Sequence, residues 1–437
     1  MLVRVLLLLC AVLLWHVPRG LAEQIHLEEV LAETRLHAID LRIAQYNLLA
    51  ATAQVAETRS DYYPQLSLRF GNEYVRVHDA DNNIVSVGDA IIADSASGYK
   101  HSLILSAHYT FYDFGRRALG LRHALGRQRI AEEQHTKVWW EIRRQVVNLY
   151  ARALKQQKMR VAQRHRNAAA QEIYRLSERL HSAGRHGREA VASAALQLAD
   201  AAIALQDLET EFANSLDALS SFTGRIYPAT TSLADLPVMN VERVFFDSGH
   251  HPDILLAQLE MDQKALELRL ARRNRYPHIV LSASHRMFGS DPQRFHESLT
   301  SLTARDSRIT LYVEVPLFSG FRSLARTARL QHELAALQLR KQKVVEDIST
   351  ELKQRQRLFQ SLSQQESMRR ERQGSIDQQL QDLTRLTQEQ MIDGIAAWKK
   401  NIELSQHQME VDLRQVDLAT QSLLLWHMSE AEQCSRL

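Results

Sequence analysis

The chain has few of the residues that interrupt helices or cross-link a chain. Of its 437 residues, 15 are glycine, 8 are proline and 2 are cysteine. Glycine and proline together make up about half of their usual share. This shortage predicts long uninterrupted helices, and the scarcity of loop residues favours one elongated body over several small domains.

The sequence also lacks an apolar run long enough for a transmembrane helix. The longest, Val5–Trp15, has 11 residues, whereas a helical span needs about 20. Lys and Arg number 54 against 51 Asp and Glu, so the net charge is only +3. These features exclude a helical membrane bundle and a disordered polymer, and they give no support to a nucleic-acid partner.

The N-terminus has the three regions of a secretory signal peptide. Arg4 precedes the apolar run, and Gly20-Leu21-Ala22 supplies the small residue of a cleavage site. We interpret residues 1–22 as a signal peptide rather than a buried N-terminal helix. Its removal would leave Cys434 as the remaining cysteine, so we expect no internal disulfide. Cys10 lacks the small residues that precede a lipid-modified cysteine, so we expect no lipoprotein anchor.

Landmarks in the sequence occur twice in the same order. Asp61–Leu68 (DYYPQLSL) resembles Asn274–Leu281 (NRYPHIVL), and Tyr112–Arg116 (YDFGR) resembles Phe318–Arg322 (FSGFR). Gly184 and Gly394 are each isolated within a long helical pattern. This order at nearly constant spacing indicates a tandem duplication. We therefore divide the chain into a signal peptide (1–22), a first repeat (23–221), a connector (222–251), a second repeat (252–429) and a tail (430–437).

Each repeat begins with a predicted helix and a predicted β-hairpin. The helix has about 24 residues, Asp40–Tyr63 or Asp253–Tyr276, and ends at a proline. The hairpins, 65–112 and 278–316, have strands in which apolar and polar residues alternate. Such strands have one apolar and one polar face.

A long helical hairpin completes each repeat. Apolar residues step by three and four through Arg117–Ser182 and through Ser323–Ile392, as in a coiled coil. After Gly184 or Gly394 a helix of about 33 residues runs back. The predicted fold class is α+β, with duplicated long helical hairpins and four strands per chain.

Four amphipathic strands in a secreted chain suggest an outer-membrane protein. Lipid accepts only helices or closed barrels, and four strands are too few because the smallest barrels use about eight. Three subunits would supply twelve. Aromatic residues gather at the strand–helix junctions: Tyr62, Tyr63, Phe111, Tyr112, Phe114, Tyr276, Phe318 and Phe321. This position favours an aromatic girdle at the membrane interface. In the second interpretation the hairpins face water and the same residues form ordinary core.

The motifs at the strand ends resemble those of TolC-type outer-membrane efflux proteins. They are YPQL (63–66), YPHI (276–279), YDFGRR (112–117) and PLFSGFR (316–322). The resemblance covers nearly the whole mature chain. It implies a homotrimer with a twelve-stranded transmembrane β-barrel in the outer membrane of a Gram-negative bacterium and a coiled-coil α-barrel in the periplasm. Solutes would arrive from an inner-membrane pump through a periplasmic adaptor, as in tripartite efflux or type I secretion.

The resemblance also implies where the functional residues lie, and it implies no catalytic residue, metal or cofactor. The junctions between strands and helices match Pro64, Gly115, Arg116, Pro277, Pro316, Gly320 and Arg322. The periplasmic tips, where the adaptor docks, match Ala183, Gly184, Arg185, Gly187, Asp393, Gly394 and Ile395. A glycine at the end of a long helix is expected in the left-handed conformation.

The pore constriction of the family carries acidic residues at two positions after the second tip glycine. Here these positions are Lys400 and Glu403, so the first reverses its charge. The pair could line the lumen or form a surface ion pair between neighbouring turns. The polar strand faces would line the barrel, with Ser67, Arg69, Ser282, Ser284, Thr310 and Glu314.

Enzyme and metal functions have little support in the sequence. No phosphate loop, nucleophile elbow or zinc-protease spacing is present. His250-His251 has neither nearby cysteines nor a helical partner for a metal site. We interpret the Arg- and Gln-rich run Lys353–Gln379 as a solvated helix face rather than a nucleic-acid-binding patch. The second functional hypothesis is a non-pore coiled-coil scaffold or spacer of the cell envelope, which would remain soluble without detergent.

Overall fold

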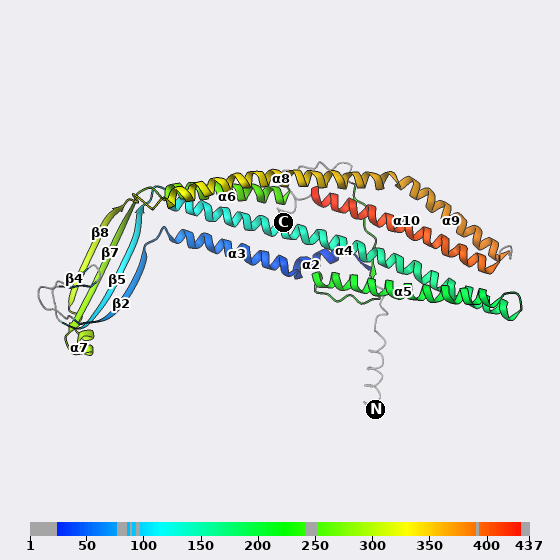
Figure 1. Cartoon of the computed structure of the whole chain (residues 1–437), viewed down its shortest axis with the longest axis horizontal. Coiled ribbons are helices and arrows are strands. Elements are labelled where there is room, and N and C mark those ends of the chain that lie inside the picture. Colours follow the sequence, from blue (N-terminus) through cyan, green and yellow to red (C-terminus); the bar gives the residue numbers. More distant parts are fainter. Residues whose placement is uncertain are drawn as a thin grey trace, which may run out of the picture. The chain divides into compact units, whose positions relative to one another are not determined.

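The computed structural model describes residues 24–76, 85–87, 90–92, 97–240, 251–389 and 393–429. Long helices and a four-stranded antiparallel sheet dominate (Figure 1). The chain divides into two compact units. Unit 1 contains Met1–Gln45, Glu133–Leu255 and Lys343–Leu437, and unit 2 contains Tyr46–Glu132 and Leu256–Gln342. The predicted signal peptide and tail lie outside the described residues.

The opening helices of the two repeats end in the same way. α3 (Ile39–Ser60) and α6 (Pro252–Arg273) each have 22 residues. Each is followed by a turn in which a tyrosine amide donates to the last helical carbonyl, Tyr63 to Ser60 at 2.9 Å and Tyr276 to Arg273 at 3.0 Å. The proline after each tyrosine disfavours further helix, because the residue before proline avoids the helical conformation.

The long helices differ between the repeats. α4 (Arg116–Ser182) runs unbroken for 67 residues, as predicted. The prediction of one helix over Ser323–Ile392 was wrong, because α8 (Arg322–Gln364) and α9 (Glu366–Gln388) are separate. Between them Gln365 stays in the right-handed helical region with φ −77°, but its ψ of −8° departs from that of a regular α-helix. Arg414 of the returning helix donates to the Gln365 side chain at 3.0 Å.

The returning helices and the connector complete unit 1. α5 (Arg188–Thr223) and α10 (Gly394–Ser429) have 36 residues each. α5 ends at Gly224, which is left-handed with φ 70°. Three elements were not predicted: β1 (Gln24–Ile25), which pairs in parallel with β6 (Ser232–Leu233), and the helix α2 (Leu27–His37).

The largest core lies in unit 1 and centres on Tyr150 of α4. Tyr150, Leu154, Phe212 and Leu216 are almost fully buried. The Tyr150 hydroxyl lies 2.7 Å from the carbonyl oxygens of both Ile25 and Ala234. Burial raises the pKa of Tyr150 well above its ordinary value. This contact fixes the β1–β6 pair against α4.

α5 is the one described helix that is long and apolar enough to cross a membrane by length and composition. Length and composition alone do not indicate a membrane span, because core helices of soluble proteins have the same properties. Phe212, Leu216 and Leu219 in its C-terminal half belong to the core, while only 11% of the apolar window is buried. The window is therefore an exposed apolar surface on a helix whose other half packs within the protein.

The sheet of unit 2 has the strand order β2-β5-β7-β8, and β2 and β8 form its two edges (Figure 1). The strands are β2 (Gln65–Val75), β5 (Gly98–Tyr112), β7 (His278–Asp291) and β8 (Ala304–Glu314). β5 pairs with β7, so the hairpins of the two repeats join into one sheet. Short elements β3 (Val85–Val87), β4 (Ala90–Ile92) and α7 (Phe295–Thr300) occur between the long strands.

The register separates the two faces of the sheet as the alternation predicts. One face carries rows such as Leu66–Ala107–Ala283–Ile309, and the other carries Ser67–Ser106–Ser284–Arg308. Side chains of the polar face interact across strands. Ser67 and Ser106 hydroxyls lie 3.0 Å apart, and Arg286 pairs with Asp306 at 2.5 Å. Leu66 and Ile309 on the other face are highly exposed in the chain.

Candidate functional site

The two strand–helix junctions share an unusual backbone. Phe114 and Gly115 have φ values of 52° and 81°, and Gly320 and Phe321 have 61° and 62°. Two consecutive left-handed residues thus precede both α4 and α8. Glycine adopts this conformation freely, whereas phenylalanine does so at a cost of about 1 kcal/mol. The predicted junction glycines, Gly115 and Gly320, each supply one of the two positions.

At the first junction, Asp113 holds the start of α4. Its carboxylate accepts hydrogen bonds from the backbone amides of Gly115 at 3.1 Å and Arg117 at 2.7 Å. The same carboxylate forms an ion pair with the Arg117 guanidinium at 3.1 Å. Arg117 also donates to the Asp61 carbonyl and stacks over Tyr62, 5.1 Å from the ring centre. Arg117 therefore ties the end of the first hairpin to the end of α3.

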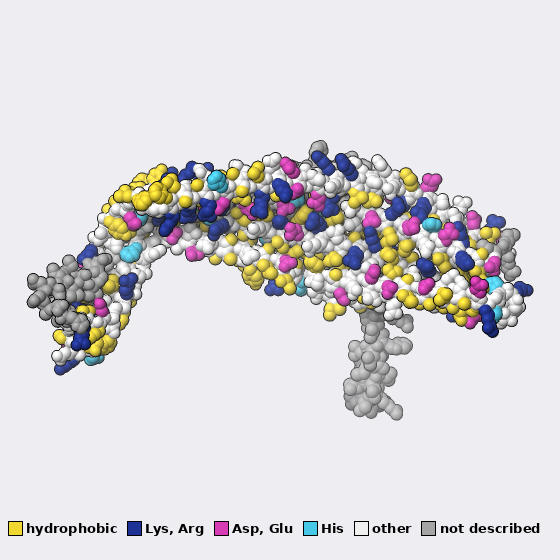
Figure 2. Space-filling model, viewed as in Figure 1, with side chains coloured by type: hydrophobic (Ala, Val, Ile, Leu, Met, Phe, Trp, Pro, Cys, Tyr) yellow, Lys and Arg dark blue, Asp and Glu magenta, His cyan; other side chains and the backbone are white. Residues whose placement is uncertain are grey.

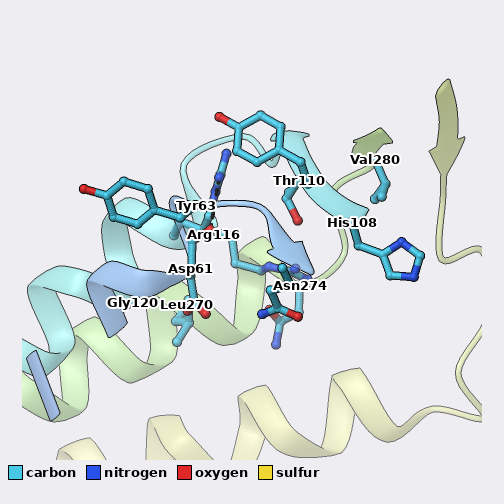
Figure 3. Close-up of a pocket in the computed structure, with 12 residues that line it drawn as sticks. Asp61, Tyr63, His108, Thr110, Arg116, Gly120, Leu270, Asn274 and Val280 are labelled. Atoms are coloured by element: carbon cyan, nitrogen blue, oxygen red, sulfur yellow. Dashed lines mark hydrogen bonds between the residues drawn. The ribbon is translucent and has the colours of Figure 1, made fainter. Parts of the chain in front are cut away.

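A cavity of about 420 Å³ lies beside this junction (Figure 3). Its walls come from the polar face of the sheet, with His108 and Thr110, and from the helix ends, with Arg116 and Asn274. The close-up labels Tyr63, Arg116 and Asn274 among the residues that line it (Figure 3). His108 is held by Ser282, whose hydroxyl lies 3.2 Å from Nδ1. The predicted junction residue Arg116 thus lines a recess with both polar and apolar walls.

The second junction is apolar. A cavity of about 530 Å³ is lined by Pro316, Leu317, Phe318, Phe321 and Leu324, together with arginines. Phe318 and Phe321 form an edge-to-face pair with ring centres 5.3 Å apart. Arg275 donates to the Ser323 hydroxyl at 2.6 Å, which joins the end of α6 to the start of α8. The predicted residues Pro316, Gly320 and Arg322 lie in this turn.

All eight aromatic residues assigned to the girdle are exposed in the chain. They are Tyr62, Tyr63, Phe111, Tyr112, Phe114, Tyr276, Phe318 and Phe321. The interpretation of these side chains as ordinary core therefore does not hold within one chain. Exposed aromatic rings at the ends of amphipathic strands are typical of a membrane interface.

The two helical tips differ in their backbone. Gly184 is left-handed with φ 72°, and the amide of Arg185 donates back to the Leu180 carbonyl at 2.8 Å. The expectation that Gly394 would take the same conformation was wrong, since Gly394 is the first residue of α10. A Cβ at Gly394 would lie 3.0 Å from Leu176 of α4. A larger residue at this position would therefore press on the Leu176 side chain.

Lys400 and Glu403, the candidates for the pore constriction, form an exposed ion pair at 3.0 Å. A polar network continues along α10. Arg372 of α9 lies 2.7 Å from Glu410 and donates to His407 Nδ1 at 2.6 Å. Next to it, buried Ile376, Leu383, Ala397, Leu404 and Val411 form a narrow apolar core between α9 and α10. Polar contacts beside this narrow apolar core thus hold α9 and α10 together.

Other groups that the sequence singled out have structural roles. His251 is buried at the start of α6, and burial lowers the pKa of its imidazole. Its ring packs edge-to-face on Trp140, with centres 5.1 Å apart. Among the described residues no group of three His, Cys, Asp or Glu side chains could hold a metal ion. His250 lies outside the described residues.

Comparison with known proteins agrees with this architecture. Residues 30–225 match the model of the outer membrane efflux protein family. The matched segment, a little under half of the chain, has the sequence features of this family. No curated protein has a matching sequence. This match agrees with the prediction of an outer-membrane efflux protein without a catalytic role.

Solved structures share the fold of this efflux protein across almost its whole length. CusC, described in connection with transmembrane channel formation, is 18% identical with a TM-score of 0.71 and 94% of each chain covered. VceC, an outer membrane protein of Vibrio cholerae, is 16% identical with a TM-score of 0.72, covering 92% of this chain and 96% of its own. The CmeC outer membrane channel of Campylobacter jejuni is 14% identical with a TM-score of 0.74, covering 94% and 85%.

The structure adds residues to the site that the sequence analysis missed. Asp113 and Arg117 organise the first junction. The motif YDFGRR was recognised in the sequence, but no role was assigned to these two residues. Asp is a preferred residue just before a helix, so its position alone would have identified this role. Gln365 carried no such signal, because glutamine is an ordinary helix former.

Proposed function

We propose that three copies of this efflux protein close a twelve-stranded barrel in the outer membrane and continue as a helical tunnel in the periplasm. The observation that carries the proposal is the pair of sheet edges. β2 and β8 each have a strand neighbour on one side only. Their unpaired backbone groups would lack partners in lipid. Pairing of β8 in one copy with β2 in the next gives the backbone groups of both edges hydrogen-bond partners. Twelve strands lie within the known range of strand numbers for transmembrane barrels.

The two faces of the sheet support this arrangement. The exposed apolar rows fit the hydrocarbon of the bilayer, and the hydrogen-bonded polar rows fit a water-filled lumen. We therefore assign the polar rows to the lumen, with Ser67, Arg69, Ser282, Ser284, Thr310 and Glu314. The cavity beside Arg116 lies on the same side of the sheet, since His108 and Thr110 belong to these rows.

An apolar stripe on α3 supports contact between copies along the helices. Ile39, Ile43 and Tyr46 follow one another at steps of four and three and are all exposed. Such a stripe marks a coiled-coil seam that needs a partner helix. On α5, Leu196 and Ile203 are also exposed and lie two turns apart. A second copy of the chain is the partner that a closed ring provides.

We assign adaptor docking to the tips of the helical hairpins. Ala183, Gly184 and Arg185 are exposed at the first tip, and the start of α10 packs against Leu176 near it. Asp393, Gly394 and Ile395 therefore lie close to the first hairpin and share its docking surface. The adaptor would connect this surface to an inner-membrane pump, which delivers the solutes. The channel itself needs no chemical step, only a wet lumen and a closable end.

The first experiment is the mass of the membrane-extracted protein in mild detergent, corrected for bound detergent. A mass of three chains is the expected result. A monomer or dimer that stays soluble after detergent removal would overturn the proposal and favour the cell-envelope scaffold. Conductance across a planar bilayer then tests whether the trimer is a channel.

A charge reversal tests the proposed constriction. If Lys400 faces the lumen, Lys400→Asp should shift the reversal potential across a salt gradient toward cation preference, because lumen charges select ions. Lys399→Asp makes the same charge change about 100° around the helix and is the matched control. Equal shifts in the two variants, or none in either, would place Lys400 on the outer surface, where its ion pair with Glu403 is a surface contact.

A further inference from the structure

The apolar cavity at the second junction is open to the outside of the chain. Leu317, Phe318 and Phe321, which line it, are 91%, 76% and 70% exposed. In the space-filling view, hydrophobic side chains gather where the strands join α8 (Figure 2). Burying apolar side chains of this size is favourable. A patch this apolar is therefore expected to be covered in the working protein.

The position of the cavity relative to the sheet indicates what covers it. Ile309, Leu311 and Val313 alternate along the apolar face of β8, and all three are exposed. Val315 and Leu317 continue the same alternation beyond the end of the strand and are exposed as well. The cavity thus lies where the apolar face ends, at the level expected for lipid headgroups.

The charges around the cavity are all of one sign. Its lining contains Arg275, Arg322 and Arg326 and no aspartate or glutamate. Arg275 is positioned by its hydrogen bond to Ser323. Arg322 and Arg326 are both exposed, and Arg326 acts at longer range on Glu267, which is not part of the lining. Guanidinium groups bind phosphate oxygens through paired hydrogen bonds.

We propose that this cavity binds an anionic phospholipid of the outer membrane. The phosphate lies between Arg322 and Arg326, and an acyl chain covers Leu317, Phe318 and Phe321. The proposal rests on the membrane placement of the sheet argued above. The first junction offers no such site, because the recess beside Arg116 also contains the carboxylate-bearing residue Asp61. The duplicated arginines, Arg116 and Arg322, have therefore taken different roles.

The test measures lipid retained by the full-length protein. The detergent-purified protein is washed free of lipid, and phosphatidylglycerol or phosphatidylcholine is added. Bound lipid per chain is then counted by native mass spectrometry. We expect phosphatidylglycerol to be retained about tenfold better, and this preference to be lost in the double variant Arg322→Gln/Arg326→Gln. Arg329→Gln is the matched control, because Arg329 is exposed on the same helix and pairs with Glu333 at 2.8 Å.

Three outcomes would overturn the lipid site. They are equal retention of the two lipids, unchanged preference in the double variant, and loss of the oligomer in the double variant with lipid still bound. The last would mean that a second copy covers the cavity. The mass and conductance of the same sample separate this inference from the proposed function. A conducting trimer without lipid preference contradicts only the lipid site, and a monomer that retains phosphatidylglycerol through these arginines contradicts only the trimer.

Discussion

At the scale of single residues, His427 near the end of α10 makes the helical part sensitive to acid. The ring is buried, and neither ring nitrogen has a hydrogen-bond partner among the described residues. Burial, followed by the positive charge of Arg143, lowers the pKa of His427 to about 3. The folded protein therefore keeps the ring neutral at a pH where the unfolded chain binds a proton.

The sign of the resulting pH dependence follows from proton linkage. Between pH 6.5 and about 3 the unfolded state holds one more proton, so the free energy of unfolding falls as pH falls. From pH 7 to pH 5 the loss is about 2 kcal/mol. His427→Leu should remove this loss of unfolding free energy. Urea midpoints followed by circular dichroism at the two pH values measure the effect, and an unchanged acid dependence in the variant would contradict the assignment.

The junction glycines give a second prediction at this scale. Gly115→Ala and Gly320→Ala should each destabilise the protein by about 1 kcal/mol, because both positions are left-handed. At neither would the added Cβ meet an atom within 4 Å, so the cost is purely conformational. Gly120→Ala is the control. It also has open space, but it lies inside α4 and should stabilise by about 1 kcal/mol. Three shifts of the same sign in the urea midpoint would argue against backbone strain.

At the scale of elements, the β1–β6 pair depends on one hydroxyl. Tyr150→Phe should cost about 1–2 kcal/mol, because the carbonyls of Ile25 and Ala234 lose a buried donor. We expect amide hydrogen exchange in β6 to accelerate about tenfold. Tyr174→Phe on the same helix removes an exposed hydroxyl bonded to Glu178 and should change the stability by less than about 0.5 kcal/mol. Equal effects of the two substitutions would refute the anchoring role.

Long elements were predictable from the sequence, and the exceptions have physical causes. The strands follow from strict alternation and α4 from its sustained period. At the break, Gln365 contacts Arg414, 49 residues away, which no local pattern contains. Gly394 looked like a helix end, but it begins α10 close to Leu176. Both positions have tertiary contacts that a local sequence pattern cannot show.

At the scale of the whole molecule, assembly should depend on the apolar stripe of α3. Ile43 is 53% exposed in the chain, so Ile43→Glu should leave the fold of one chain intact while it disrupts packing between copies. We expect the detergent-extracted trimer to dissociate. Gln45→Glu also adds a negative charge, about half a turn away, and should leave the mass unchanged. A trimer that survives Ile43→Glu would move the seam to another helix.

The family and the architecture could be reached from the sequence because they rest on repeated motifs along the whole chain. The site was only partly accessible. The tip glycines were identified by their isolation and the junction glycines by the repeated strand-end motifs, while Asp113 and Arg117 needed the turn geometry to reveal their role. Whether Lys400 faces the lumen depends on the placement of neighbouring copies, which one sequence does not encode locally.

The open edges of the sheet also have a genetic consequence. In a homotrimer each chain supplies β2 to one neighbour and β8 to the other, so every barrel needs all six edges. A variant damaged only in β8 could still offer an intact β2 and enter mixed trimers. If half of the chains carried the damage, roughly one in eight trimers would be free of it. Edge-strand mutations should therefore be dominant, whereas mutations that prevent a chain from folding at all should be recessive.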